Sequence, residues 1–113
     1  MNLNNFTIKS QEAIQKSQEI ALSYQNQSIE CVHILKGIFH VDENIVPYLL
    51  KKMGVNVSLI QQAVDKIITS LPKVVGGNQY LSSEANQMLV KSTQIATDMG
   101  DEFVSIEHLL LAM

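Results

Sequence analysis

The sequence predicts an all-α protein, a helical bundle made of two pseudo-repeats. Three observations support this fold class. Apolar residues recur at steps of three and four along most of the chain, helix start and stop residues interrupt that pattern, and a shift of 75 positions superimposes the beginning on the end. The 113 residues, 46% of them hydrophobic and 17% charged, suffice for one packed core but not for two. We therefore expect a single domain over residues 1–113.

The first repeat is expected over about residues 7–71, and two helices are predicted at its beginning. Thr7 is a suitable N-cap for a helix that reaches about Leu22. Small or apolar residues form one stripe on that helix, namely Ile14, Ser17, Ala21 and Tyr24. From Ser28 to about Phe39, apolar residues cover most of the circumference. A second helix is therefore expected there, largely buried.

Two shorter helices and a linker complete the first repeat. Pro47 suits the first turn of a short helix that Gly54 ends. Ser58, with Gln61 three residues later, forms a capping-box pattern that predicts the start of the next helix. Residues 72–80 are rich in Gly and Asn at their centre, which predicts a linker between the repeats.

The second repeat is expected over residues 81–113, and it is incomplete. Ser82 is placed to cap a helix that Gly100 ends, and Ser105 to cap another. Under the 75-position shift, the counterpart of Leu71 would lie beyond Met113. The chain is therefore expected to be a piece of a longer protein.

Composition disfavours several classes of function. All eight basic residues are lysines, and without arginine a nucleic-acid-binding role is disfavoured. Cys31 is the only cysteine, so we expect no disulfide, a reducing compartment, and a buried, unreactive thiol. No signal peptide or membrane-spanning apolar stretch is evident in the sequence. We expect a cytoplasmic protein that does not bind membranes.

The histidines are the main candidates for chemistry. His33 and His108 occupy equivalent positions in the two repeats, which leaves a small hydrolase or a metal site as an alternative. Neither has a second ligand at a firm spacing, so packed, hydrogen-bonded structural histidines are favoured. His40, Asp42 and Glu43 could form a weak metal cluster, but such residues also suit an exposed loop. We predict no metal site.

No motif for phosphate binding or nucleophilic catalysis occurs in the chain, which contains neither Gly-x-x-x-x-Gly-Lys-Ser/Thr nor Gly-x-Ser-x-Gly. We therefore expect a domain that is not an enzyme and holds no cofactor. From Glu84 onward there are five acids and one lysine. An apolar groove with an acidic rim suits an extended polypeptide, and an ordinary solvated acidic surface is the open alternative.

A family resemblance rests on the segment Gly100-Asp101-x-Phe103-Val104-Ser105-x-Glu107-His108-Leu109-Leu110-Leu111-Ala112. With the repeat, it resembles the double repeat that opens the Clp ATPases. The opening Asn5-Phe6-Thr7-x-Lys9-Ser10-Gln11-Glu12-Ala13 and the linker Leu71-Pro72-Lys73-Val74 look most like the ClpB branch, the protein disaggregases. The first copy departs from the pattern, because Glu30 stands three residues before His33 instead of beside it. Any role of the Glu-His pair is therefore assigned to the second copy only.

The resemblance implies a non-catalytic amino-terminal domain that engages unfolded or aggregated clients. The full-length protein would be a homohexameric ATPase that uses ATP and Mg, threads clients through its ring and works with an Hsp70-type chaperone system. Thr7, Asp101 and Glu107 match positions that the family implicates in client binding. Nearby apolar residues are expected to supply the groove, namely Leu89, Val90, Leu109 and Leu110. The alternative is the adaptor- or substrate-docking domain of a ClpC- or ClpA-type unfoldase that feeds a protease.

Overall fold

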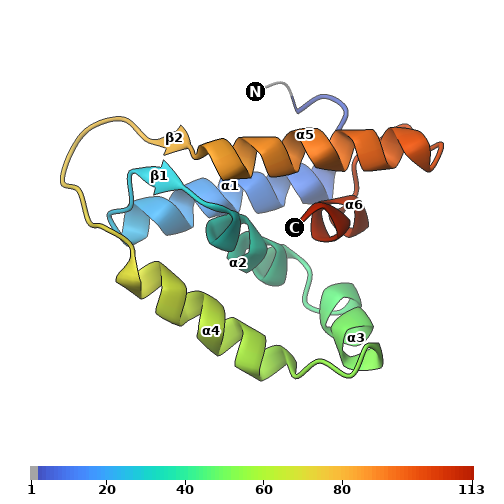
Figure 1. Cartoon of the computed structure of the whole chain (residues 1–113), viewed down its shortest axis with the longest axis horizontal. Helices are drawn as coiled ribbons and strands as arrows, with labels where there is room; N and C mark the ends of the chain where they lie inside the picture. Colours follow the sequence, from blue (N-terminus) through green and yellow to red (C-terminus); the bar gives the residue numbers. More distant parts are fainter. Residues whose placement is uncertain (1–2) are drawn as a thin grey trace.

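The computed structural model describes residues 3–113 as an all-α domain, as predicted, to which two very short strands are added (Figure 1). In chain order the elements are α1 (Ile8–Ser23), β1 (Ser28–Ile29), α2 (Cys31–Val41), α3 (Ile45–Lys52), α4 (Val57–Ser70), β2 (Tyr80–Leu81), α5 (Ser83–Asp98) and α6 (Ile106–Ala112). Within these residues, no helix combines the length and the apolar character needed to cross a membrane.

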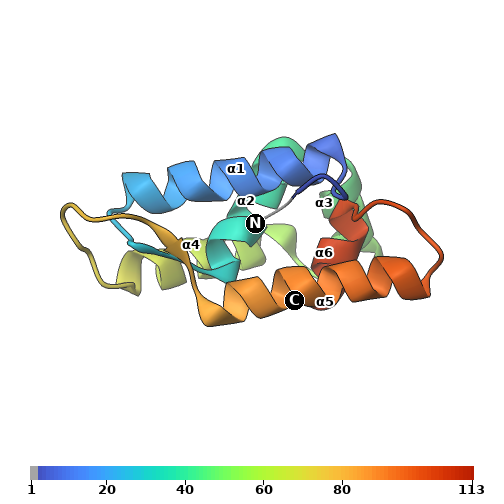
Figure 2. The ribbon, with the colours of Figure 1, turned by 90° about the horizontal axis from the view of Figure 1, so that it is seen from above.

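The long helices α1 and α5 run in opposite directions along the two long sides of the molecule (Figure 2). α2 packs against α1 and α6 packs against α5, so that α2 and α6 lie between the two long helices. α4 packs against α2, and α3 contacts both α2 and α4. α3 and α4 thus lie below the α1–α5 pair (Figure 1).

The first helix of each repeat begins at the predicted cap. Thr7 Oγ1 accepts a hydrogen bond from the Ser10 N–H at 3.2 Å, and Ser82 Oγ accepts one from the Ala85 N–H at 3.0 Å. Each side chain satisfies a backbone donor that the first turn of a helix leaves without an intrahelical partner. The sequence therefore located both helix starts correctly.

The predicted start of α4 at Ser58 is wrong. Asn56 is the N-cap, and its Oδ1 accepts a hydrogen bond from the Leu59 N–H at 3.2 Å. Ser58 lies inside the first turn, where its hydroxyl accepts a bond from the Gln62 side chain. Because Asn56 already caps the helix, the Ser58 side chain does not accept a hydrogen bond from a backbone N–H of the first turn.

The second helix begins at Cys31, three residues later than predicted, because the preceding residues form β1. Ser28 and Ile29 pair in parallel with Tyr80 and Leu81 of β2. Ile29 is buried by this pairing instead of by a helical face. Its apolar side chain therefore made the helix look longer than it is.

The two repeats are joined by crossed pairings. Phe6, which precedes α1, forms a parallel bridge with Val104, which precedes α6. Leu81, which precedes α5, pairs in parallel with Ile29, which precedes α2. The 75-position shift converts one pairing into the other. The structure therefore has an internal pseudo-twofold symmetry in which each repeat supplies the strand partner of the other.

α1 and α2 approach each other closely at Gly37. A Cβ atom placed on Gly37 would overlap the carbonyl oxygen of Ala13 and would lie 3.3 Å from the backbone nitrogen of Ser17. Ala13 and Ser17 are wholly buried. Ser17, which was predicted in the stripe of α1, and Ala13, which was not, therefore allow near contact of the two backbones.

Two hydrophobic clusters form the core. The larger lies among α1, α2, α5 and α6 and includes Ile34, Ile38, Leu89 and Leu109, all without exposed surface. The smaller joins α1 to α4 through Ile20, Val64 and Ile68, with Tyr24, Val32, Leu35 and Ile60 packed at its edge. The larger cluster therefore supports the loop and helix start at the carboxyl end of α5.

Gln25 is the only described non-glycine residue with a positive φ, and its counterpart in the second repeat is Gly100. The φ angles are 59° and 74°, a region that is costly for side chains with a Cβ. We expect Gln25→Gly to raise the free energy of unfolding by about 0.5–1 kcal/mol. Urea unfolding would measure it.

Gly100→Ala is the matched control for this prediction. A Cβ on Gly100 meets no atom within 4 Å, so the substitution changes only the backbone preference. We expect it to lower the free energy of unfolding by about 1 kcal/mol. Equal stability of all three proteins would show that the left-handed position carries no cost at either repeat.

Candidate functional site

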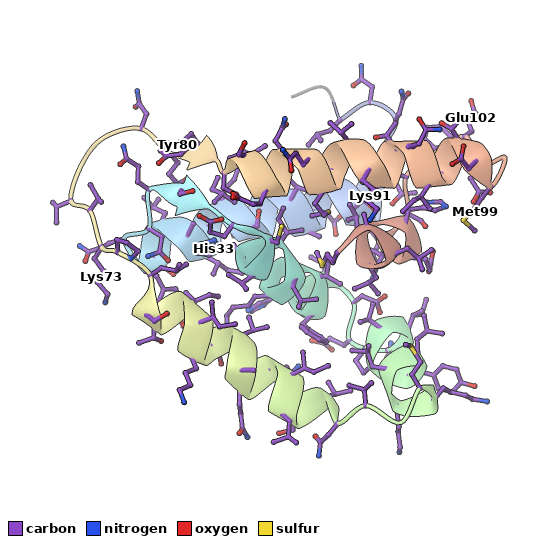
Figure 3. The ribbon with its side chains drawn as sticks, viewed as in Figure 1. His33, Lys73, Tyr80, Lys91, Met99 and Glu102 are labelled. Carbon is purple, nitrogen blue, oxygen red and sulfur yellow. The ribbon has the colours of Figure 1, made fainter. Side chains whose placement is uncertain are left out.

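The candidate site lies where α5 ends, the chain reverses and α6 begins. Gly100 takes the left-handed conformation, and the Asp101 N–H donates to the Ala96 carbonyl at 2.8 Å. Met99 and Glu102 mark this end of α5 in Figure 3, at the opposite end of the molecule from Lys73 and Tyr80. The turn places the Asp101 carboxylate beside the first turn of α6.

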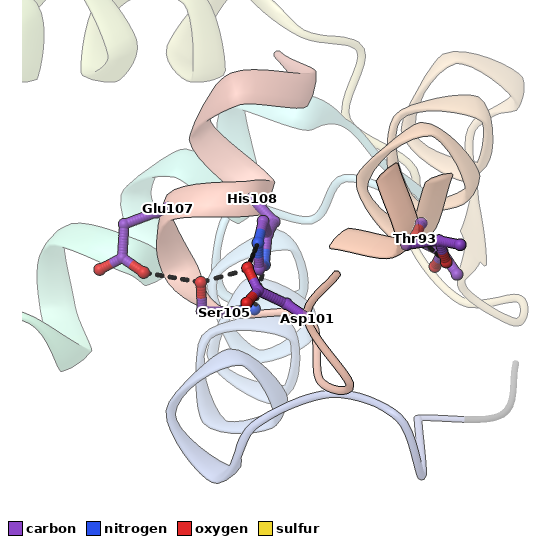
Figure 4. A network of polar contacts seen from close by, with 6 residues as sticks. Thr93, Asp101, Ser105, Glu107 and His108 are labelled. Atoms are coloured by element: carbon purple, nitrogen blue, oxygen red, sulfur yellow. Dashed lines mark hydrogen bonds and ion pairs between the residues drawn. The ribbon is translucent and has the colours of Figure 1, made fainter. Parts of the chain in front are cut away.

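His108 holds the Asp101 carboxylate in place. Its ring is buried, and Nδ1 accepts a hydrogen bond from the Ser105 backbone N–H at 2.9 Å. The ring proton is therefore on Nε2, which donates to Asp101 Oδ2 at 2.8 Å (Figure 4). Because the lone pair of Nδ1 is engaged by the backbone at the helix start, the ring is a structural group instead of a free base.

Glu107 is oriented by the N-cap of the same helix. Ser105 Oγ donates to Glu107 Oε2 at 2.6 Å, and the same oxygen lies 3.1 Å from Nδ1 of His108 (Figure 4). Glu107 is exposed, and the side chain of Asp101 is 50% exposed. A serine and a buried histidine thus hold two carboxylates at the surface.

Thr7 is joined to this region through the backbone. Its N–H donates to the Val104 carbonyl at 3.0 Å, which places the start of α1 against the segment between Asp101 and Glu107. The Thr7 hydroxyl donates to Ser10 Oγ at 2.9 Å, so it is engaged in the capping of α1. The structure therefore brings the three predicted polar residues into one region of the molecule.

The four predicted apolar residues do not share one surface. Val90 is 58% exposed and Leu110 is half-buried, but Leu89 and Leu109 are fully buried in the core. The expectation that Leu89 and Leu109 supply a groove does not hold in this structure, because both lie on the inward stripe of their helices.

Two exposed apolar residues that the prediction omitted are near the carboxylates in sequence. Phe103 is 47% exposed and stands in the loop between Asp101 and Glu107, and Leu111 is 59% exposed on α6. The sequence did contain a signal for Phe103, namely an aromatic residue within an acidic loop. A loop has no helical periodicity that would place such a side chain in the core, so exposure was a reasonable expectation.

The first repeat contains the same histidine arrangement with a neutral partner. His33 Nδ1 accepts from the Glu30 N–H at 2.8 Å, and Nε2 donates to Asn26 Oδ1 at 3.0 Å. Burial lowers the pKa of His33, and the charge of Glu30 opposes this shift. Both histidines therefore have the packed, hydrogen-bonded role that was predicted.

The other candidate chemical groups have local roles. Among residues 3–113, no three His, Cys, Asp or Glu side chains are grouped so that they could hold a metal ion. Asp42 Oδ1 accepts from the Ile45 N–H at 2.9 Å and helps to start α3. Cys31 was expected to be buried but is only partly so, and burial raises the pKa of its thiol.

The sequence matches a known domain family and curated chaperones along its whole length. The family model described as the Clp repeat (R) N-terminal domain matches residues 5–113. The chain is 52% identical over 113 residues to chaperone protein ClpB of Bacteroides thetaiotaomicron and 46% identical to that of Porphyromonas gingivalis. All of this chain is aligned in both cases, but it spans only 13% of the length of each relative.

Solved structures agree on the fold. The Hsp104 N-terminal domain of Candida albicans has a TM-score of 0.87 at 22% identity, with 96% of this chain and 73% of that chain covered. The ClpV1 N-terminal domain of E. coli has a TM-score of 0.88 at 19% identity, with 97% and 68% covered. Together with the match over residues 5–113, the sequence and the fold place this chain in the family of Clp repeat N-terminal domains.

Proposed function

We propose that this chain is the non-catalytic client-binding module of a ClpB-type, ATP-dependent protein disaggregase. The observation that supports this proposal most is the 52% identity over the whole chain with a ClpB chaperone. The site adds a physical reason. Two surface carboxylates and an exposed aromatic ring suit a polypeptide that offers amide or basic groups next to apolar side chains.

The hydrogen bonds around the site reduce the cost of binding. Asp101 is fixed by His108 and Glu107 by Ser105, so the carboxylates lose little freedom when they meet a client. A bond between a carboxylate and a client donor is charge-assisted and strong for a surface contact. Thr7 contributes through its side chain, which caps α1 and so holds the start of that helix, with its N–H on the Val104 carbonyl, in this region.

The wider role belongs to the whole protein. We propose that the full-length chain forms a homohexameric cytoplasmic ATPase that binds ATP and Mg outside this domain and cooperates with an Hsp70-type chaperone system. This domain would deliver unfolded or aggregated polypeptide to the ring. Nucleic acids and membranes have no part in this proposal.

The second candidate is an adaptor-docking domain of a ClpC- or ClpA-type unfoldase. It draws on the fold alone, since the ClpD N-terminal domain of Arabidopsis thaliana has a TM-score of 0.75 at 18% identity. The two candidates differ in the ligand. A disaggregase module binds unfolded polypeptide directly, whereas an adaptor-docking module binds a folded adaptor and does not bind unfolded polypeptide.

We expect Thr7→Ala, Asp101→Ala and Glu107→Ala each to weaken binding of an unfolded polypeptide. For the two carboxylates the loss should be about 10- to 100-fold, because each variant removes a charge-assisted hydrogen bond worth about 1.5–3 kcal/mol. Fluorescence anisotropy with labelled, reduced and carboxymethylated α-lactalbumin measures this, at a temperature where every variant is folded.

Two control variants outside the site distinguish a direct effect on binding from an effect on folding stability. Ser82→Ala removes the cap of α5 as Thr7→Ala removes that of α1, and each should cost about 1 kcal/mol of folding free energy. Glu84→Ala removes an exposed acid elsewhere. If these two variants weaken binding as much as the site variants do, the site assignment is wrong.

A further inference from the structure

The linker after α4 contacts the turn that follows α1, and it bends at Gly76 and Gly77, which have positive φ angles. The Val74 N–H donates to the Gln25 carbonyl at 2.8 Å, and Nδ2 of Asn26 donates to the Pro72 carbonyl at 3.1 Å. Figure 3 shows Lys73 on this linker, at the end of the molecule away from the candidate site. The first repeat therefore already holds a peptide segment at the turn that follows α1.

A second side chain in this turn binds the linker in the same way. Nε2 of Gln27 donates to the Asn78 carbonyl at 3.1 Å. Asn26 and Gln27 are thus two consecutive amides that each donate to a linker carbonyl. To residues 72–78 the turn Gln25–Gln27 offers the Gln25 carbonyl as acceptor and two side-chain donors, and its other two carbonyls accept from Gln79 and Tyr80.

The second repeat has the same turn at Gly100–Glu102. The N–H groups of Asn26 and Asp101 donate to Ala21 and Ala96 carbonyls, respectively, each at 2.8 Å. Both side chains also accept a bond from Nε2 of the buried histidine of their repeat. The two turns therefore present equivalent atoms in equivalent positions.

The side chains of the two turns have opposite hydrogen-bonding roles, donors in the first repeat and acceptors in the second. Where the first repeat has the amides Asn26 and Gln27, the second has the carboxylates Asp101 and Glu102, which only accept hydrogen bonds. Oδ2 of Asp101 is engaged by the histidine, and within residues 3–113 Oδ1 makes no hydrogen bond. Asn26 is 3% exposed beneath the linker, but the Asp101 side chain is 50% exposed.

We propose that the turn Gly100–Glu102 is a docking site for a polypeptide segment, which lies there as residues 72–78 lie on Gln25–Gln27. A backbone N–H of the segment donates to the Gly100 carbonyl. Hydrogen-bond donors, such as lysine ammonium groups, meet Asp101 and Glu102 where linker carbonyls meet the two amides of the first repeat. This inference rests on the proposed client binding and specifies its geometry.

The test changes the hydrogen-bonding groups of both the turn and the peptide. One protein is wild type, and the other carries Asp101→Asn and Glu102→Gln, which reproduce the amides of the first repeat. The histidine bond is retained, because Asn26 makes the same bond to His33. One probe is a capped peptide with the sequence of residues 71–79, and the other has lysine in place of Pro72 and Asn78.

NMR titration of the Gly100 amide to about 10 mM peptide covers affinities in the millimolar range. We expect the native linker peptide to bind the double variant at least fivefold more tightly than wild type, and the lysine peptide to show the reverse preference. N-methylation at the Val74 nitrogen should abolish binding of both peptides.

Three results would overturn this geometry, namely no shift at Gly100, no exchange of preference, or equal binding of the N-methylated peptides. The proposed function is judged separately, by binding of the unfolded polypeptide to Asp101→Ala and Glu107→Ala. Loss of that binding without an exchange of peptide preference would retain the function and reject the docking geometry.

Discussion

Gly37→Ala is expected to lower the free energy of unfolding by about 3 kcal/mol or more. Alanine normally stabilises a helix by about 1 kcal/mol relative to glycine. Here the added Cβ would overlap the Ala13 carbonyl oxygen, which is backbone and cannot rotate away. Separating α1 from α2 would open the main core.

Urea unfolding measures this change, with Ala112→Gly as the matched control. Ala112 is the counterpart of Gly37 on α6 and is buried at 7% exposure. Removing its methyl group should cost only about 1 kcal/mol. If Gly37→Ala is as stable as wild type, α1 and α2 can move apart freely and the close approach is not a constraint.

Acidification is expected to destabilise the domain through His33. Burial lowers the pKa of this ring below its usual value of 6.5, so the unfolded state binds the proton first as the pH falls. Protonation would also place a hydrogen on Nδ1, where the ring now accepts the Glu30 N–H. This stabilisation is complete above the usual pKa and is lost below it, at up to about 1.4 kcal/mol per pH unit.

His33→Gln removes this titration and retains an acceptor at the same helix position, because glutamine there completes a capping box. Urea midpoints at several pH values between about 7.5 and 5 should fall more steeply for wild type than for the variant. His40 and His108 are present in both proteins, so the difference isolates His33. Parallel curves would show that its protonation does not oppose folding.

Local signals in the sequence located most of the fold. Thr7 and Ser82 act on donors within their own first turn, so no distant contact is needed to predict them. The strand pairings were missed, because two-residue strands carry no periodicity and their partners are remote in sequence. The start of α4 was misplaced because Asn56 and Ser58 are both good caps, and only the preceding turn selects between them.

The candidate site was predictable in its residue types but not in its geometry. The approach of Thr7 to the loop before α6 depends on the bridge between Phe6 and Val104, which no local pattern predicts. The histidine bonds to Asp101 and Asn26 depend on the chain reversal after α5 and α1. Helical periodicity alone places Leu89 on the inward face of α5. The structure agrees with that periodicity and not with the expectation that Leu89 lines a groove.

The crossed strand pairings constrain the order of folding. The hairpins α1–α2 and α5–α6 are local and can form early, whereas joining Phe6 to Val104 closes almost the whole chain into a loop. The entropy cost of that closure grows only slowly with loop length. A chain cut in the linker would leave two halves, each lacking a partner for its own strand. Such halves would recover both pairings only by associating with each other.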